Sequence, residues 1–161
     1  MNNVAIKPIV RRTALDAMLV TLACLVPAAS HMLGLPLYKA NPMLALLLAG
    51  VLLGRDWRNA LLLAVAMPLA SGLLVGMPAG PKMICMMAEL ATVAGLFTLA
   101  SRRLKALPAV LLAIAAGKAV YYALKALLLA PAMLVGTDWK LQLLAALLWG
   151  GLFALLFAKR K

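Results

Sequence analysis

The chain has 161 residues, 66% of them hydrophobic, and a mean hydropathy of +1.05. This composition excludes a soluble globular domain, because such domains carry fewer apolar and more charged residues. The formal net charge of +12 would favour nucleic acid binding in a soluble protein. Here the basic residues flank apolar segments, so we interpret them as a collar that anchors helices in a lipid bilayer, and we expect no nucleic acid partner.

Six apolar segments follow one another along the chain and predict an all-α integral membrane bundle. With its connection, each segment takes about 27 of the 161 residues, against the ~20 that a helix needs to cross a bilayer. We therefore expect one membrane domain over residues 1–161, with little left over for a soluble module. The six predicted transmembrane helices cover residues 14–33, 43–54, 57–76, 83–100, 107–130 and 141–158.

The connections between the predicted helices alternate between few and many basic residues. The odd-numbered connections hold three: Lys39, Lys82 and Lys140. The chain ends and the even-numbered connections hold eleven: Lys7, Arg11, Arg12, Arg55, Arg58, Arg102, Arg103, Lys105, Lys159, Arg160 and Lys161. The positive-inside rule then predicts that both the N-terminus and the C-terminus are cytoplasmic.

The first predicted helix carries small residues at a spacing of four, at Thr13, Ala17 and Thr21. Such a small-xxx-small stripe lets a second helix approach closely. The stripe serves either packing within the bundle or contact with another protein, and the sequence leaves both open.

The connection of residues 31–42 leads into an unusually short apolar segment. It contains Tyr38 and Asn41; Asn41 suits an N-cap ahead of Pro42, and equally a ligand-facing amide. As a helix, residues 43–54 would span only about 18 Å, against the ~30 Å of the hydrocarbon core. Either the helix extends back through the connection, or it is short and leaves room for a pocket open to the outside.

Ionisable side chains inside the fourth and fifth predicted helices are the strongest local signal. Glu89 lies about 10 Å from the outer end of its helix, at a depth similar to that of Lys125. Lys118 lies two turns deeper. A charge at membrane depth is costly, so it faces a partner or a wet cavity. We expect Glu89 to pair with one lysine, and the other to meet an anionic or strongly hydrogen-bonding ligand group.

Aromatic and thioether groups accompany these charges. Tyr121 and Tyr122 lie between the two lysines, Met86 lies near Glu89, and Trp139 belongs to the third external connection. They suit an elongated organic ligand with a polar end, although a methionine stripe also arises from simple packing. One outward-facing cavity, closed above by the loop of residues 31–42, is predicted to be lined by Glu89, Lys118, Tyr121 and Lys125.

Enzymatic and metal-binding patterns are absent from the sequence. It has no H-E-x-x-H, G-x-S-x-G or Walker motif, and its single histidine, His31, lies in a connection. Cys24 and Cys85 lie inside apolar segments without a C-x-x-C motif, so we expect neither a metal site nor a disulfide. We predict no enzyme activity and no cofactor, and any ATP hydrolysis would come from a partner.

Short motifs in a fixed order cover most of the second to fifth predicted helices. They are Asn41-Pro42-Met43, LAGVLLGR at 48–55, MPLASGLLVGMP at 67–78, MMAEL at 86–90 and AGK at 116–118. Together with the six-helix pattern, these motifs resemble the substrate-binding S components of energy-coupling factor (ECF) transporters, of the vitamin type.

That resemblance implies a small multi-pass protein of the prokaryotic cytoplasmic (inner) membrane that binds a vitamin or related micronutrient. Its implied partners are a transmembrane coupling subunit and two ATP-binding subunits. Family members present an alanine-rich stripe on the first helix to the coupling subunit, and Thr13, Ala17 and Thr21 stand at that place here. Nickel and cobalt members use an N-terminal histidine, which Met1-Asn2-Asn3 does not provide, so the resemblance argues against a metal substrate.

Two other classes of protein fit the same composition. A small membrane scaffold or assembly protein would bind no small molecule. A solitary proton- or ion-conducting bundle would use Glu89 and the lysines and would conduct without ATP. No internal repeat of the kind found in secondary transporters is evident in the sequence.

Overall fold

The computed structural model describes residues 3–34, 40–54, 56–78, 80–128 and 139–159, with only the backbone described at 3–9, 31 and 139. In these ranges all regular structure is helical. Five of the helices are long and apolar enough to cross a membrane, and α2 is a shorter apolar helix. The predicted all-helical, multi-pass architecture is therefore confirmed. The helices are α1 (Asn3–Leu33), α2 (Pro42–Gly54), α3 (Trp57–Val75), α4 (Gly80–Ala100), α5 (Ala106–Leu128) and α7 (Trp139–Ala158).

The predicted start of the first helix is wrong, because α1 begins at Asn3 and not at residue 14. Arg11 and Arg12 therefore lie within the helix instead of in front of it. The apolar span inside α1 is Val10–Ser30. Hydropathy marks only the part of a helix that suits the bilayer. Helical hydrogen bonding can continue beyond that part, and arginine is a good helix former.

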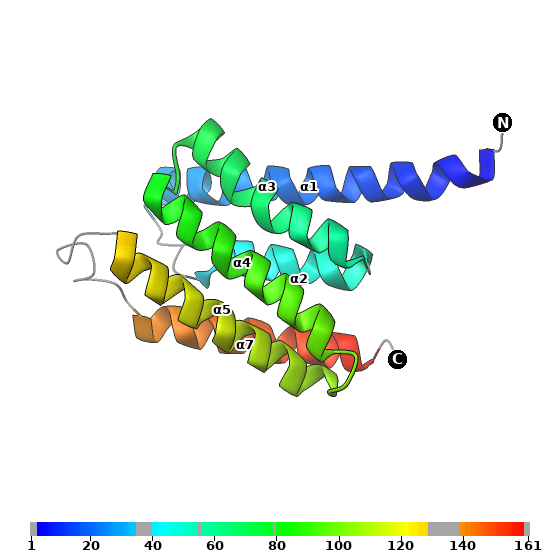
Figure 1. The fold of residues 1–161 in the computed structure, drawn as a ribbon. Helices are drawn as coiled ribbons and strands as arrows, with labels where there is room; N and C mark the ends of the chain where they lie inside the picture. Colours follow the sequence, from blue (N-terminus) through cyan, green and yellow to red (C-terminus); the bar gives the residue numbers. More distant parts are fainter. Residues whose placement is uncertain (1–2, 35–39, 55, 79, 129–138, 160–161) are drawn as a thin grey trace.

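The short form of the second helix is the correct alternative, because α2 has 13 residues and begins at Pro42. Asn41 takes a left-handed backbone conformation with φ of 53°, which asparagine tolerates better than most residues. Its carbonyl oxygen accepts the first helical hydrogen bonds, from the backbone nitrogens of Leu44 and Ala45. Figure 1 shows α2 (cyan) beginning further into the bundle than the neighbouring ends of α5 and α7.

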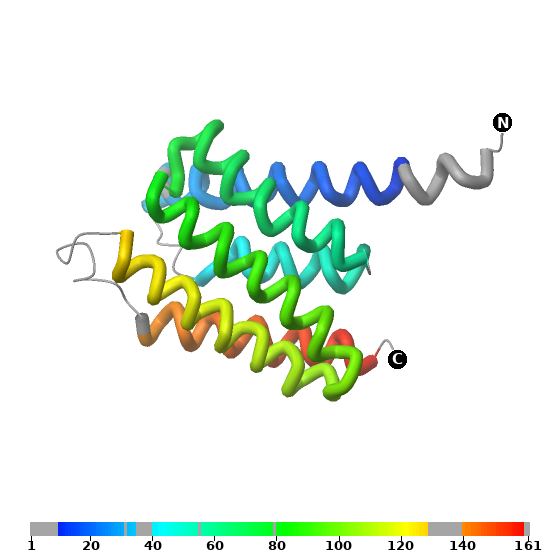
Figure 2. The backbone as a smooth tube through the Cα atoms, viewed as in Figure 1, coloured from blue at the N-terminus to red at the C-terminus, as the bar shows by residue number. Residues whose placement is uncertain are grey.

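The helices alternate in direction, so the N-terminal end of α1 and the C-terminal end of α7 lie at the same end of the bundle (Figures 1 and 2). The short helix α2 is the inner one and packs against α1, α3, α4 and α7. Its Leu44, Leu47 and Leu48 are fully buried. Within the described residues α1 packs against α2 and α3, which leaves it at one edge.

Large apolar side chains cover the outside of the bundle as well as its core. Leu73 and Leu74 of α3, Leu127 of α5 and Leu155 of α7 each expose at least 66% of their surface. Continuous apolar exposure of this kind would cause aggregation of a soluble protein, whereas it suits contact with lipid tails. The outer surface therefore agrees with the multi-pass membrane architecture.

Two side-chain contacts fasten α1 to the beginning of α3, at the end of the bundle towards which both chain termini lie. Arg12 Nη2 donates to Asp56 Oδ2 at 2.9 Å, and Asn59 Nδ2 donates to Asp16 Oδ1 at 2.7 Å. Asp56 also accepts from the backbone nitrogen of Arg58 at 2.9 Å and so caps α3. These bonds, that from Arg12 above all, hold the pKa of the Asp56 carboxyl below its usual value.

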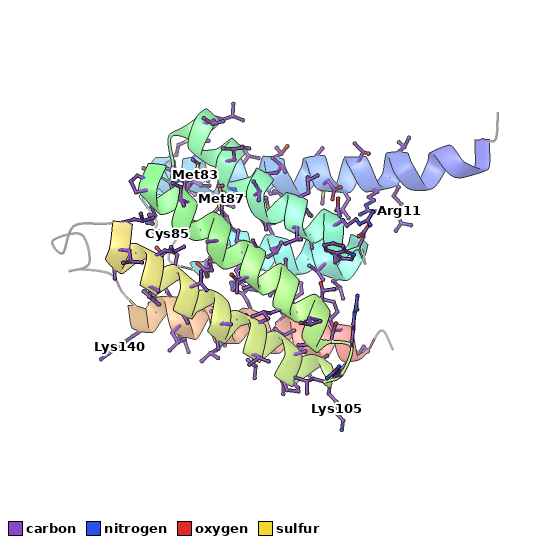
Figure 3. The ribbon with its side chains drawn as sticks, in the orientation of Figure 1. Arg11, Met83, Cys85, Met87, Lys105 and Lys140 are labelled. Atoms are coloured by element: carbon purple, nitrogen blue, oxygen red, sulfur yellow. The ribbon has the colours of Figure 1, made fainter. Side chains whose placement is uncertain are left out.

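We expect Arg11 and Lys105 to lie on one side of the membrane and Lys140 on the other, as Figure 3 places them at opposite ends of the bundle. In a background with Cys24→Ala and Cys85→Ala, a membrane-impermeant maleimide should label Arg11→Cys and Lys105→Cys from the same side. It should label Lys140→Cys from the opposite side. Labelling of Arg11→Cys and Lys140→Cys from one side would contradict the arrangement.

Candidate binding site between helices α4 and α5

The close approach of α5 to α4 depends on Gly117. A Cβ atom at this position would lie 2.5 Å from Cγ2 of Val93 and 3.0 Å from the backbone oxygen of Glu89. Only glycine leaves room for the two backbones to meet at this distance. The next residue along α5, Lys118, is thereby brought beside Glu89.

Lys118 and Glu89 form a buried ion pair. Lys118 Nζ lies 2.7 Å from Glu89 Oε1, and the side chains are only 7% and 4% exposed. At this distance the Lys118 ammonium is the partner of Glu89 Oε1. A carboxylate has about four lone-pair sites, so this one contact does not use all of its acceptor capacity.

The helix limits explain why Glu89 meets Lys118 and not Lys125. The predicted depths took residue 83 and residue 130 as the outer ends of the two helices. The helix α4 instead begins at Gly80, so Glu89 lies nine residues along it (89 − 80). Counted back from Leu128, the last residue of α5 that the structure describes, Lys118 lies ten residues along the helix (128 − 118) and Lys125 three (128 − 125). The depth of Glu89 therefore matches that of Lys118.

Two tyrosines extend this cluster along α5. The ring centroid of Tyr121 lies 5.3 Å from Lys118 Nζ, within the range of a cation–π interaction. The rings of Tyr121 and Tyr122 meet edge to face, with centroids 5.3 Å apart. The hydroxyl oxygen of Tyr122 is buried and has no hydrogen-bond partner within the described part of the chain.

Lys125 lies on the same buried face of α5, towards the end that carries Lys140. Its electrostatic neighbours on α4 are Lys82, in the first turn, and the buried Cys85. Lys82 was not among the predicted site residues, although it stands seven positions before Glu89 and so shares a helix face with it. This seven-residue spacing was the sequence signal that could have added Lys82 to the predicted site. Two lysines thus occupy the end of the α4–α5 seam that lies towards Lys140.

Asn41 contributes a further buried amide, from the start of α2. Its Nδ2 atom has no hydrogen-bond partner among the described residues. The backbone beside it is fastened to α7, because Trp149 Nε1 donates to the carbonyl oxygen of Ala40 at 2.7 Å. The backbone carbonyl oxygen of Asn41 thus accepts the first hydrogen bonds of α2, and its Nδ2 atom keeps a donor that no described residue uses.

The remaining predicted site residues fall into two groups. Met86 is half-buried and packs against the hydrophobic core, as the packing interpretation expects. Tyr38 lies outside the described residues, and so does the side chain of Trp139, whose backbone begins α7. The predicted cavity and its covering loop remain predictions. The structure does bring together Glu89, Lys118, Tyr121 and Tyr122, with Lys125 on the same face.

The predicted docking stripe lies on the outer surface of α1. Thr13, Ala17 and Thr21 are all exposed, and the Thr21 hydroxyl donates to the carbonyl oxygen of Ala17 at 2.8 Å. The stripe is therefore not used to pack α1 against another described helix of the chain. It is available for contact with a second molecule or with lipid.

A hollow of about 270 Å³ lies at the other end of the bundle, the end towards which both chain termini lie. We call it the basic-end hollow. It is formed where α2, α4 and α7 end and where α3 and α5 begin. Its walls are made by Val51, Leu52, Asp56, Trp57, Phe97, Thr98, Ser101, Leu104, Ala106 and Phe157.

Comparisons with family models, with curated proteins and with solved structures give no match for this chain. Its function is therefore argued from the residues and their arrangement.

Replacing Gly117 with alanine should force α5 away from α4, because the new Cβ would meet Val93 and the Glu89 backbone. We expect a loss of about 1–3 kcal/mol, typical of an overpacked site. The matched control is Gly95→Ala on α4, where a Cβ meets nothing within 4 Å; it should leave stability unchanged or raise it. Thermal unfolding in one detergent compares the two variants, and equal melting temperatures would contradict the close approach.

Proposed function

We propose that this protein is the membrane-embedded binding subunit of an uptake system for a vitamin or related small organic micronutrient, of the S-component type. The observation that carries the proposal is the buried charged cluster of Glu89, Lys118 and Lys125 inside an apolar bundle. Among the described residues these three are the buried Asp, Glu, Lys and Arg side chains, so one carboxylate accompanies two lysines. Charges at membrane depth are rare and mark functional sites.

Buried polar atoms without partners support the same proposal. In the described part of the chain they include Asn41 Nδ2 and Tyr122 Oη. Folded proteins satisfy nearly all their buried polar groups, so such atoms mark places for a ligand or for water. Together with the Glu89 carboxylate, they offer an acceptor, a donor and a hydroxyl that serves as either.

The chemistry of these groups describes the ligand by class. A donor group on the ligand, N–H or O–H, would bind the Glu89 carboxylate. An anionic group would lie nearer the outer end, where Lys125 and Lys82 share one part of the seam. The tyrosine faces beside Lys118 suit a flat or elongated apolar body between the two polar ends. A small organic acid with hydrogen-bond donors fits this set.

The positive-inside rule supports the orientation in which the ligand enters from outside. With both termini cytoplasmic, Lys82 and Lys125 lie towards the external face and the basic-end hollow lies towards the cytoplasm. In the proposed system, a transmembrane coupling subunit contacts the exposed stripe of Thr13, Ala17 and Thr21, and two ATP-binding subunits drive transport. The stripe suits that contact because small side chains admit a partner helix closely.

Native mass spectrometry of gently purified protein tests the proposal. The wild type should carry a co-purified small organic compound. Lys125→Met keeps the length of the side chain and removes its charge, so affinity for that compound should fall about tenfold or more. That loss corresponds to a charge-assisted hydrogen bond of roughly 1.5–3 kcal/mol.

The matched control is Lys140→Met, which removes an exposed lysine at the same end of the bundle, away from the α4–α5 seam. It should retain the compound. Detergent melting of both variants separates lost binding from lost folding. A wild type that never carries a compound would favour a scaffold protein, and full retention by Lys125→Met would contradict the site.

A further inference from the structure

The basic-end hollow is separate from the proposed ligand site and differs from it in chemistry. Its volume of about 270 Å³ falls just below the roughly 300–1,000 Å³ of pockets that enclose a whole drug-sized ligand. It lies where five helices begin or end. The hollow therefore suits part of a larger molecule whose remainder stays outside the protein.

The walls of the hollow offer apolar surface and few free polar groups. The rings of Phe97 and Phe157 meet with centroids 4.8 Å apart, and Trp57 is 48% exposed. The hydroxyls of Thr98 and Ser101 donate to carbonyl oxygens of their own helix. A hydrophilic metabolite would find little to bind on these walls.

The single acid in the walls is neutralised. Asp56 forms an ion pair with Arg12 at 2.9 Å and caps α3 through the backbone nitrogen of Arg58. It therefore does not repel an anion at the mouth of the hollow.

Five exposed basic residues stand within two positions of a wall residue along the chain, and we call them the basic rim. Figure 3 shows Lys105 pointing away from the bundle at this end. The residues of the rim come from the start of α3, from the α4–α5 connection and from the end of α7: Arg58, Arg102, Arg103, Lys105 and Lys159.

We propose that the hollow seats one anionic phospholipid. The phosphate contacts the basic rim, and the glycerol and upper acyl groups lie against the aromatic walls. The position agrees with this occupant, because helix ends and exposed tryptophan mark the headgroup level of a bilayer. Basic pockets between transmembrane helices bind anionic headgroups by the same combination of charge and apolar contact.

The test measures lipid binding by native mass spectrometry, with phosphatidylglycerol and phosphatidylcholine of the same acyl chains as probes. The wild type should retain one phosphatidylglycerol in preference to phosphatidylcholine. The double variant Arg102→Gln with Arg103→Gln removes two rim charges and should lower that affinity roughly tenfold or more. The matched control, Arg11→Gln with Lys140→Gln, removes two exposed charges outside the rim and should bind as the wild type does.

A second variant tests the walls without changing charge. Ala106→Phe, at the first residue of α5, fills part of the hollow and should also reduce phosphatidylglycerol binding. Melting of each variant in the same detergent confirms that it is folded. Equal losses in the rim variant and its control would show general charge attraction and overturn the proposal. It would also be overturned by unchanged binding to Ala106→Phe, or by soluble glycerol phosphate binding as tightly as the lipid.

Discussion

The buried contact between Lys118 and Glu89 fixes the position of α5 along α4, and the candidate site depends on it. Neither charge is tolerated alone at this depth, since an unpaired ion in an apolar interior is strongly destabilising. The pair therefore admits one register, in which Gly117 lies against the α4 backbone. That register places Tyr121 beside the ion pair and Lys125 near the first turn of α4.

The same register places Tyr122 against Tyr121, and the buried hydroxyl oxygen of Tyr122 has no hydrogen-bond partner within the described residues. Folded proteins satisfy nearly all their buried polar groups, so this atom favours a ligand site over structural support alone. The short inner helix α2 adds to this effect. It starts deep in the bundle and brings the buried amide of Asn41 with it.

Much of the fold could be predicted from the sequence, because hydropathy and charge report directly on bilayer contact. The apolar spans and the burial of Glu89, Lys118 and Lys125 follow from the cost of polar groups in lipid. The sequence left open whether α2 is short or extends back through the connection, and whether Glu89 pairs with Lys118 or Lys125. The partner of Glu89 depends on where α4 begins, which is Gly80 and not residue 83, and a shift of three residues is most of a helical turn.

Other features depend on contacts between elements that are distant in the sequence. The basic-end hollow arises where the ends of five helices meet, and no local pattern reports on that meeting. Lys82 shares a helix face with Glu89, yet its role depends on how near Lys125 comes across the seam. The extension of α1 back to Asn3 lies beyond its apolar span, where hydropathy carries no information.

A double-mutant cycle on the ion pair tests the central claim most directly. The measurement is thermal unfolding of Lys118→Met, Glu89→Gln and the double variant in one detergent. Each single variant leaves one buried group without its partner and should lose on the order of 3 kcal/mol, while the double variant should recover most of that loss. Single variants that melt like the wild type, or a double variant whose loss is the sum of the two, would contradict the claim that this pair sets the register of α4 and α5.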